Sequence, residues 1–198
     1  MKYRILEDDP ERKIKALLFC SPRQGEGNST VLTHFAITLA SDGERVFLVD
    51  ANLRDPSLHK TFDVSMENGL TDLILGQKNL EEVTKPTSYG ALWLITSGSP
   101  YPNPLQVIDS KAFDSHLEEM KTRAEWVLFD CPSVNSYMDG IALAGKVDGV
   151  VMVVMAEKTR WEVAQNMKRK LESSNGKILG VVLNKRRYRV PKWLYKRL

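Results

Sequence analysis

Six short apolar runs alternate with amphipathic segments, and this alternation constrains the fold more than any other feature. The runs span residues 15–21, 45–51, 91–98, 125–131, 148–156 and 177–184. They are nearly continuous in apolar residues, as parallel strands are when both faces of the sheet are covered. Helical patterns lie between them at 29–41, about 67–75, about 106–123, 138–145 and 160–173. The chain is therefore predicted to be α/β, with a mainly parallel sheet and helices on both faces.

The carboxyl ends of these strands are the expected place for a ligand, because open parallel sheets bind ligands at that edge. The polar residues at these ends are Ser21, Asp50, Asp130, Glu157 and Asn184. A binding site for this chain is therefore sought among them.

The loop after the first run reads SPRQGEGNST, residues 21–30. Gly25 and Gly27 let the backbone turn its N–H groups inward, and the helix that follows adds its positive N-terminal end. Ser29 stands where a P-loop has its Mg²⁺-binding hydroxyl, but Asn28 stands where that motif has lysine. Taken alone, the loop is open to two interpretations: a phosphate site, or a glycine-rich turn with Asn28 as helix cap.

Two acids strengthen the first interpretation. Asp50 and Asp130 each follow an apolar strand and, with the Ser29 hydroxyl, offer the hard oxygen ligands that Mg²⁺ prefers. A single aspartate in such a position is more often a turn or cap residue, so the argument depends on the two acids and the serine together.

These motifs resemble those of the bacterial tyrosine kinase family, whose ATPase domains regulate capsular and exopolysaccharide assembly. GEGNST matches the family's GEGKST loop except at Asn28, and FLVDANLRDPSLH matches its second motif except at Asn52, where the family has aspartate. The segments with counterparts in the same order are GLTDLILG, the PNP of residues 102–104, WVLFDCP, Asp139, DGVVMVV and GVVLN.

The resemblance implies a three-layer P-loop NTPase fold over residues 1–184, followed by a tail at 185–198. It also implies binding of ATP or ADP with Mg²⁺. By position, the phosphate-binding residues would be Gly25, Glu26, Gly27, Asn28, Ser29 and Thr30, and the metal ligands Ser29, Asp50 and Asp130. Asn184 would lie near the purine, and the second motif would supply Asp50, Asn52 and Arg54, with Arg54 near the phosphates or a neighbouring subunit.

Asn28 and Asn52 remove one positive and one negative charge from the groups most engaged with the transferred phosphate. A charge-assisted hydrogen bond is worth about 1.5–3 kcal/mol, so binding would weaken roughly ten- to a hundredfold. Cationic stabilisation of phosphoryl transfer is worth about 10³–10⁵ in rate, so turnover would suffer more. Arg23 is hypothesised to supply part of the missing charge; a solvated loop arginine is the open alternative.

The sequence thus favours a nucleotide-binding regulator or scaffold of exopolysaccharide biosynthesis or export, with weak or no phosphoryl transfer. The alternatives are an active tyrosine autokinase or slow ATPase, and a DNA- or surface-positioning ATPase, against which the PNP loop argues. The expected partner is a membrane chain-length regulator or polysaccharide export protein. Homo-oligomerisation is left open.

The tail holds seven of the 28 basic residues and no acidic residue, which leaves 21 basic against 25 acidic residues in 1–184. Its cations are interleaved with aromatic residues, Tyr188 and Tyr195 among them, which fits contact with an anionic membrane surface. A solvated or docked tail is equally open, and nucleic acid is disfavoured. Without a signal peptide or long apolar run, and with Cys20 and Cys131 expected as buried thiols, the sequence predicts a cytoplasmic protein, which would be peripheral at the inner membrane face if the tail binds there.

Overall fold

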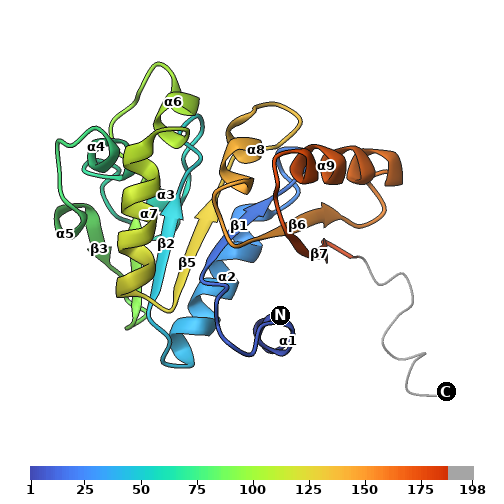
Figure 1. Ribbon diagram of the computed structural model, residues 1–198, viewed down its shortest axis with the longest axis horizontal. Coiled ribbons are helices and arrows are strands. Elements are labelled where there is room, and N and C mark those ends of the chain that lie inside the picture. Colours follow the sequence, from blue (N-terminus) through green and yellow to red (C-terminus); the bar gives the residue numbers. More distant parts are fainter. Residues whose placement is uncertain (187–198) are drawn as a thin grey trace.

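One seven-stranded sheet organises the protein in the computed structural model, which describes residues 1–186 (Figure 1). The strand order is β3-β4-β2-β5-β1-β6-β7. The strands are β1 (Ala16–Cys20), β2 (Val46–Asp50), β3 (Thr84–Pro86), β4 (Leu92–Ile95), β5 (Trp126–Asp130), β6 (Gly149–Met155) and β7 (Ile178–Asn184). Every neighbouring pair is parallel except β3 with β4, so the prediction of a mainly parallel sheet is confirmed.

Helices cover both faces of this sheet and complete the three layers. One face packs against α1 (Lys2–Asp8), α2 (Asn28–Ser41) and α3 (Leu58–Thr61). The other packs against α4 (Leu70–Ile74), α5 (Leu80–Val83), α6 (Pro104–Ile108), α7 (Lys111–Arg123), α8 (Asp139–Ala144) and α9 (Trp161–Ser173). Within the described chain, none of these helices has both the length and the apolar character needed to span a membrane.

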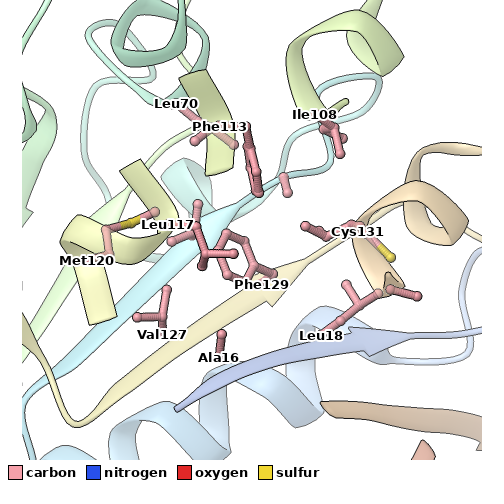
Figure 2. Packing of buried hydrophobic residues seen from close by; sticks show 14 of the residues in the cluster. Ala16, Leu18, Leu70, Ile108, Phe113, Leu117, Met120, Val127, Phe129 and Cys131 are labelled. Atoms are coloured by element: carbon pink, nitrogen blue, oxygen red, sulfur yellow. The ribbon is translucent and has the colours of Figure 1, made fainter. Parts of the chain in front are cut away.

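In the core on the α7 side, the spacing of the apolar residues along each segment determines which of them face the core. Phe113, Leu117 and Met120 recur at helical spacing and point at β5, where Val127 and Phe129 share one strand face (Figure 2). The Phe113 and Phe129 rings lie 5.9 Å apart between centroids. This packing fixes β5, and so places Asp130 at its carboxyl end.

The predicted helix at 106–123 is wrong as one element, because Ser110 divides it into α6 and α7. The Ser110 hydroxyl accepts from the Phe113 N–H at 3.1 Å and donates to the Val107 carbonyl at 2.8 Å. It therefore caps the start of α7, and its other bond ties that cap to the last turn of α6.

β7 also differs from its predicted character as a buried strand. It lies at the sheet edge, with Val181 59% and Leu183 60% exposed. Continuous apolar character therefore did not mean burial on both faces here. Both thiols, Cys20 and Cys131, are free and buried as predicted. Tail residues 187–198, with Tyr188 and Tyr195, lie outside the described residues.

Candidate functional site

The loop between β1 and α2 has the backbone shape that an anion site needs. Gly25 and Gly27 have φ of 82° and 93°, a region that residues with a side chain rarely adopt. The first N–H groups of any helix have no intrahelical partner, and Gly27, the N-cap of α2, has no side chain to bind them. A cavity of about 160 Å³ lies against the loop. Its lining comprises Ser21, Gln24, Gly25, Gly27, Asn28, Ser29, Thr30, Asn52, Cys131, Pro132 and Ser133.

A second cavity of about 250 Å³ adjoins the first, with which it shares four lining residues: Gln24, Asn52, Pro132 and Ser133. Its other lining residues are Arg54, Asp55, Ser136 and Tyr137. Together the two cavities join the loop after β1 with the segments that follow β2 and β5. Most of the sequence-predicted site residues are thus brought to one edge of the sheet.

Asn28, at the position of the P-loop lysine, is engaged with the ends of the strands. Its side-chain Nδ2 donates to the Phe19 carbonyl at 2.9 Å and to Oδ1 of Asp130 at 2.7 Å. The residue is only 8% exposed, and within residues 1–186 its Oδ1 has no hydrogen-bond partner. The amide therefore binds the sheet, and it carries no charge to offer a phosphate.

Two buried carboxyl groups stand side by side beneath the loop. Asp50 and Asp130 are paired in the register of β2 and β5, and both are fully buried. Burial raises the pKa of Asp50 to about 7, and the charge of Asp130 adds to the rise. Burial also raises the pKa of Asp130 to about 6, although hydrogen bonds from Ser29 and Asn28 oppose the shift. The pair lacks the positive charge that a P-loop lysine would bring.

The two carboxylates have different neighbours. Asp130 accepts from the Ser29 hydroxyl, with 2.5 Å between Oγ and Oδ2. Oδ2 of Asp50 accepts from the N–H groups of Ser57 and Leu58, each at 3.0 Å, at the start of α3. Asp50 therefore also anchors the start of that short helix, which is the common role of a single aspartate at a strand end.

The oxygen atoms at this edge fit a magnesium ion held partly by nucleotide. Residues 1–186 contain no group of three or more His, Cys, Asp or Glu that could hold a metal. Ser29 and Asp130, whose oxygens are in contact, offer hard ligands of the type that Mg²⁺ takes alongside phosphates and water. Any such ion would therefore need phosphate oxygens to complete its shell.

Arg54 has a carboxylate partner, and an aromatic ring lies beneath its guanidinium. It donates to Asp139 through Nε at 2.5 Å and through an Nη atom at 3.1 Å. Asp139 is 1% exposed, and the guanidinium carbon lies 4.3 Å from the centre of the Tyr137 ring. Arg54 is thus a wall of the larger cavity, held by α8, and its charge is already shared with Asp139.

We expect Asp139→Asn to lower the free energy of unfolding by about 1.5–3 kcal/mol, because charge-assisted hydrogen bonds contribute about that much. Urea denaturation at pH 7 would measure the change. Asp109→Asn serves as the control: that side chain is 70% exposed and 4.0 Å from Lys146, so its loss should matter little. Equal effects of the two substitutions would contradict this prediction.

Asn52, at the second-motif position, closes a turn of its own loop. Its Nδ2 donates to the Asp55 carbonyl at 2.7 Å, and its Oδ1 accepts from the Asp55 N–H at 3.2 Å. Gln24 of the glycine loop donates to the Asp55 carboxylate at 2.9 Å. Asn52 therefore shapes the segment that lines both cavities and introduces no charge.

The outer side of the glycine loop is held by segments far along the chain. Nδ2 of Asn184 donates to the Glu26 carbonyl at 2.8 Å, and the Thr159 hydroxyl donates to Oε1 of Glu26 at 2.9 Å. Burial raises the pKa of Glu26, while the Thr159 hydrogen bond and the charges of Arg23 and Lys185 act against the rise. Glu26 and Asn184 thus contribute to the shape of the loop.

Arg23 is exposed on the loop, and its carbonyl accepts from the Ser21 hydroxyl at 3.0 Å. Two contacts escaped the sequence analysis: Thr159 with Glu26, and Lys185 with the Gly25 carbonyl at 2.7 Å. Thr159 had a usable signal, since it follows the end of β6. Lys185 had none, because it opens the run of basic residues that was assigned to the tail.

Residues 14–174 match the profile of a family described as Cellulose biosynthesis protein BcsQ. Over 174 residues the chain is 32% identical to the tyrosine-protein kinase YwqD of Bacillus subtilis (strain 168), which covers 88% of this chain and 73% of the relative. These matches extend over nearly all the elements that build the site.

Solved structures agree with both the fold and the sequence match. The crystal structure of the chimerical protein CapA2B2 superposes with a TM-score of 0.89 at 28% identity, covering 94% of this chain and 82% of that one. The septum site-determining protein MinD of Pyrococcus horikoshii, complexed with Mg-ADP, gives a TM-score of 0.74 at 20% identity, over 93% and 76% of the two chains. At that identity the likeness is one of fold alone.

Proposed function

This chain belongs to the bacterial tyrosine kinase family and has the P-loop ATPase fold, and we propose that it acts chiefly as a nucleotide-binding regulator or scaffold. It would work in exopolysaccharide biosynthesis or export at the cytoplasmic side of the membrane. A membrane chain-length regulator or export protein is the proposed partner. Phosphoryl transfer would be weak or absent.

The observation that carries this proposal is that Asn28, which stands at the lysine position, is uncharged and hydrogen-bonded to the sheet. The loop has the backbone shape that phosphate binding needs, with two left-handed glycines and no side-chain cap at the start of α2. The cation of the loop is replaced by an amide that hydrogen-bonds to Phe19 and Asp130. Binding draws mainly on backbone N–H groups and on Mg²⁺, whereas transfer depends on fixed positive charge at the reacting phosphate. Nucleotide binding would therefore be retained even where phosphoryl transfer is lost.

In the proposed complex the chain's own groups have separate tasks. The N–H groups of the loop and of the first turn of α2 would hold the phosphates. The Ser29 hydroxyl and the Asp130 carboxylate would hold Mg²⁺, which offsets phosphate charge when bound. Asp50 would support them from the second strand. The cavity beside Arg54 would accept the group that approaches the terminal phosphate.

Isothermal titration with ATP and ADP, with and without Mg²⁺, combined with phosphotyrosine detection, tests the proposal. We expect Mg²⁺-dependent binding of both nucleotides with little or no phosphotyrosine or phosphate release. Robust autophosphorylation would replace the proposal with the second candidate, an active autokinase, which the paired acids Asp50 and Asp130 favour. No binding of either nucleotide would contradict both.

A further inference from the structure

The glycine loop carries a lysine at its outer side that does not come from the loop itself. Lys185 follows the last strand, 157 positions after Asn28. We infer that Lys185 supplies a phosphate-binding cation to this site, in place of the lysine that Asn28 has replaced. This inference rests on the proposed nucleotide binding and adds to it a side chain that contributes to phosphate affinity.

The contact geometry places Lys185 on the loop and not in a separate tail. Its ammonium donates to the Gly25 carbonyl at 2.7 Å, and the preceding residue, Asn184, donates to the Glu26 carbonyl at 2.8 Å. Two consecutive residues at the end of β7 thus bind two consecutive loop carbonyls. The predicted boundary between domain and tail, after Asn184, thus falls between two residues that bind the same loop.

Gly27 shows how close this approach is. A Cβ atom added to Gly27 would clash with Nδ2 of Asn184 and would lie 3.5 Å from Cε of Lys185. Gly27 is also the N-cap of α2, so the lysine stem passes beside the start of that helix. The ammonium therefore lies within reach of the helix end where a phosphate would bind.

The electrostatics of this arrangement favour an anionic ligand. A cation near the N-terminal end of a helix is unfavourable by itself, because that end carries partial positive charge. The bond from Lys185 goes to a neutral carbonyl and uses one of the three N–H donors of the ammonium. A phosphate bound between helix end and ammonium would be attracted by both. Lys185 is exposed, so its four-carbon stem has room to turn toward such a ligand.

Asn28 cannot perform this task, because its amide N–H groups are bound to Phe19 and Asp130. Burial raises the pKa of Glu26, and Arg23 is the other cation whose charge, with that of Lys185, acts against this rise. Of these two, Lys185 is the one whose ammonium is hydrogen-bonded to the loop, which keeps its charge beside the loop. The loss of the family lysine is thereby offset from the far end of the chain.

The test compares ADP, pyrophosphate and adenosine binding to the full chain by isothermal titration with Mg²⁺. Lys185→Ala is expected to weaken ADP and pyrophosphate binding roughly ten- to a hundredfold, the loss of one charge-assisted hydrogen bond. Adenosine has no phosphate, so its affinity should stay unchanged. Lys177→Ala, just before the other end of β7, is the matched control, and Lys185→Arg should retain most of the affinity.

A double substitution sharpens the test. When Asn28→Lys restores the loop cation, the further change Lys185→Ala should cost much less than it does alone. If the unmodified protein binds ADP and Lys185→Ala binds it equally well, this inference fails while the proposed function stands. An equal loss of adenosine affinity would assign Lys185 to loop support and overturn the phosphate role. If the unmodified protein binds neither ADP nor pyrophosphate, the proposed function fails and the role of Lys185 fails with it.

Discussion

Replacing Asn28 by lysine is expected to raise phosphoryl transfer on the order of 10³-fold, the scale on which a cation stabilises the transferring phosphoryl group. Asn28 lines the smaller cavity, so a longer side chain at this position can extend into it. The new ammonium would lie among the backbone N–H groups of the loop and add the fixed charge that Asn28 lacks. ATP hydrolysis and phosphotyrosine formation would report the change.

The design of this test depends on separating charge from length. Asn28→Met has nearly the length of lysine without its charge, and it should remain at the rate of the unmodified protein. Adding Asn52→Asp restores the second-motif acid, and Asp at this position can still accept from the Asp55 N–H. We expect the double substitution Asn28→Lys with Asn52→Asp to exceed Asn28→Lys alone. A lysine variant that binds ATP but turns over no faster would contradict the assignment of Asn28 as the limiting residue.

The sequence predicted the sheet and the edge at which its polar residues gather, because both depend on short-range patterns. Apolar runs marked six of the seven strands, and the rule that ligands bind at strand carboxyl ends brought Asp50 and Asp130 together. β3 and the helices α1, α3 and α5 were missed because each is too short for a periodic signal. The sequence predicted α6 and α7 as one helix, because the Ser110 cap between them does not interrupt the helical spacing of the apolar residues.

Side-chain partners could not be predicted in the same way, since they depend on where distant segments meet. Asn28 was recognised as a departure, but its bonds to Phe19 and Asp130 follow from the packing of α2 against β1 and β5. Arg54 was expected near the phosphates or a neighbouring subunit, but its ion pair with Asp139 at the wall of the adjoining cavity could not be foreseen. The charge of the site is therefore a property of the tertiary structure and not of the motif.

The buried acids predict an unusual dependence of stability on pH. The pKa of Asp50 is about 7 and that of Asp130 about 6, against an ordinary value of 3.8. Between about pH 4 and pH 7 the folded protein therefore holds protons that the unfolded chain releases, so raising the pH lowers the free energy of unfolding. The shift of Asp50 alone corresponds to about 4 kcal/mol. Urea denaturation at pH 5 and pH 8, without Mg²⁺ or nucleotide, should show the loss.

The salt bridge between Arg45 and Glu125 affects stability at lower pH than the two buried aspartates do, so the two effects can be distinguished. Hydrogen bonds from Arg45 lower the pKa of Glu125 to about 2, against an ordinary value of 4.5. Its stabilising contribution is present above about pH 4.5 and is lost as the pH falls toward 2. Stability should therefore rise from pH 2 to 4.5 because of Glu125, and fall above that because of the two aspartates. A flat profile between pH 5 and 8 would contradict the assignment of raised pKa values to them.

Asp130→Asn should separate stability from function at this site. An asparagine here can still accept from Nδ2 of Asn28 and can donate to the Ser29 hydroxyl, so the hydrogen bonds are replaced while the charge is removed. At pH 8 we expect the free energy of unfolding to rise by up to about 3 kcal/mol, the equivalent of the Asp130 shift. The pKa of Asp50 should also fall, because the charge of Asp130 contributes to its rise. The same substitution should abolish the Mg²⁺ dependence of nucleotide binding, and Asp63→Asn, an exposed aspartate, should change neither property. If Asp130→Asn destabilised the protein at pH 8, the charge of Asp130 would not be a source of instability that is retained for magnesium binding.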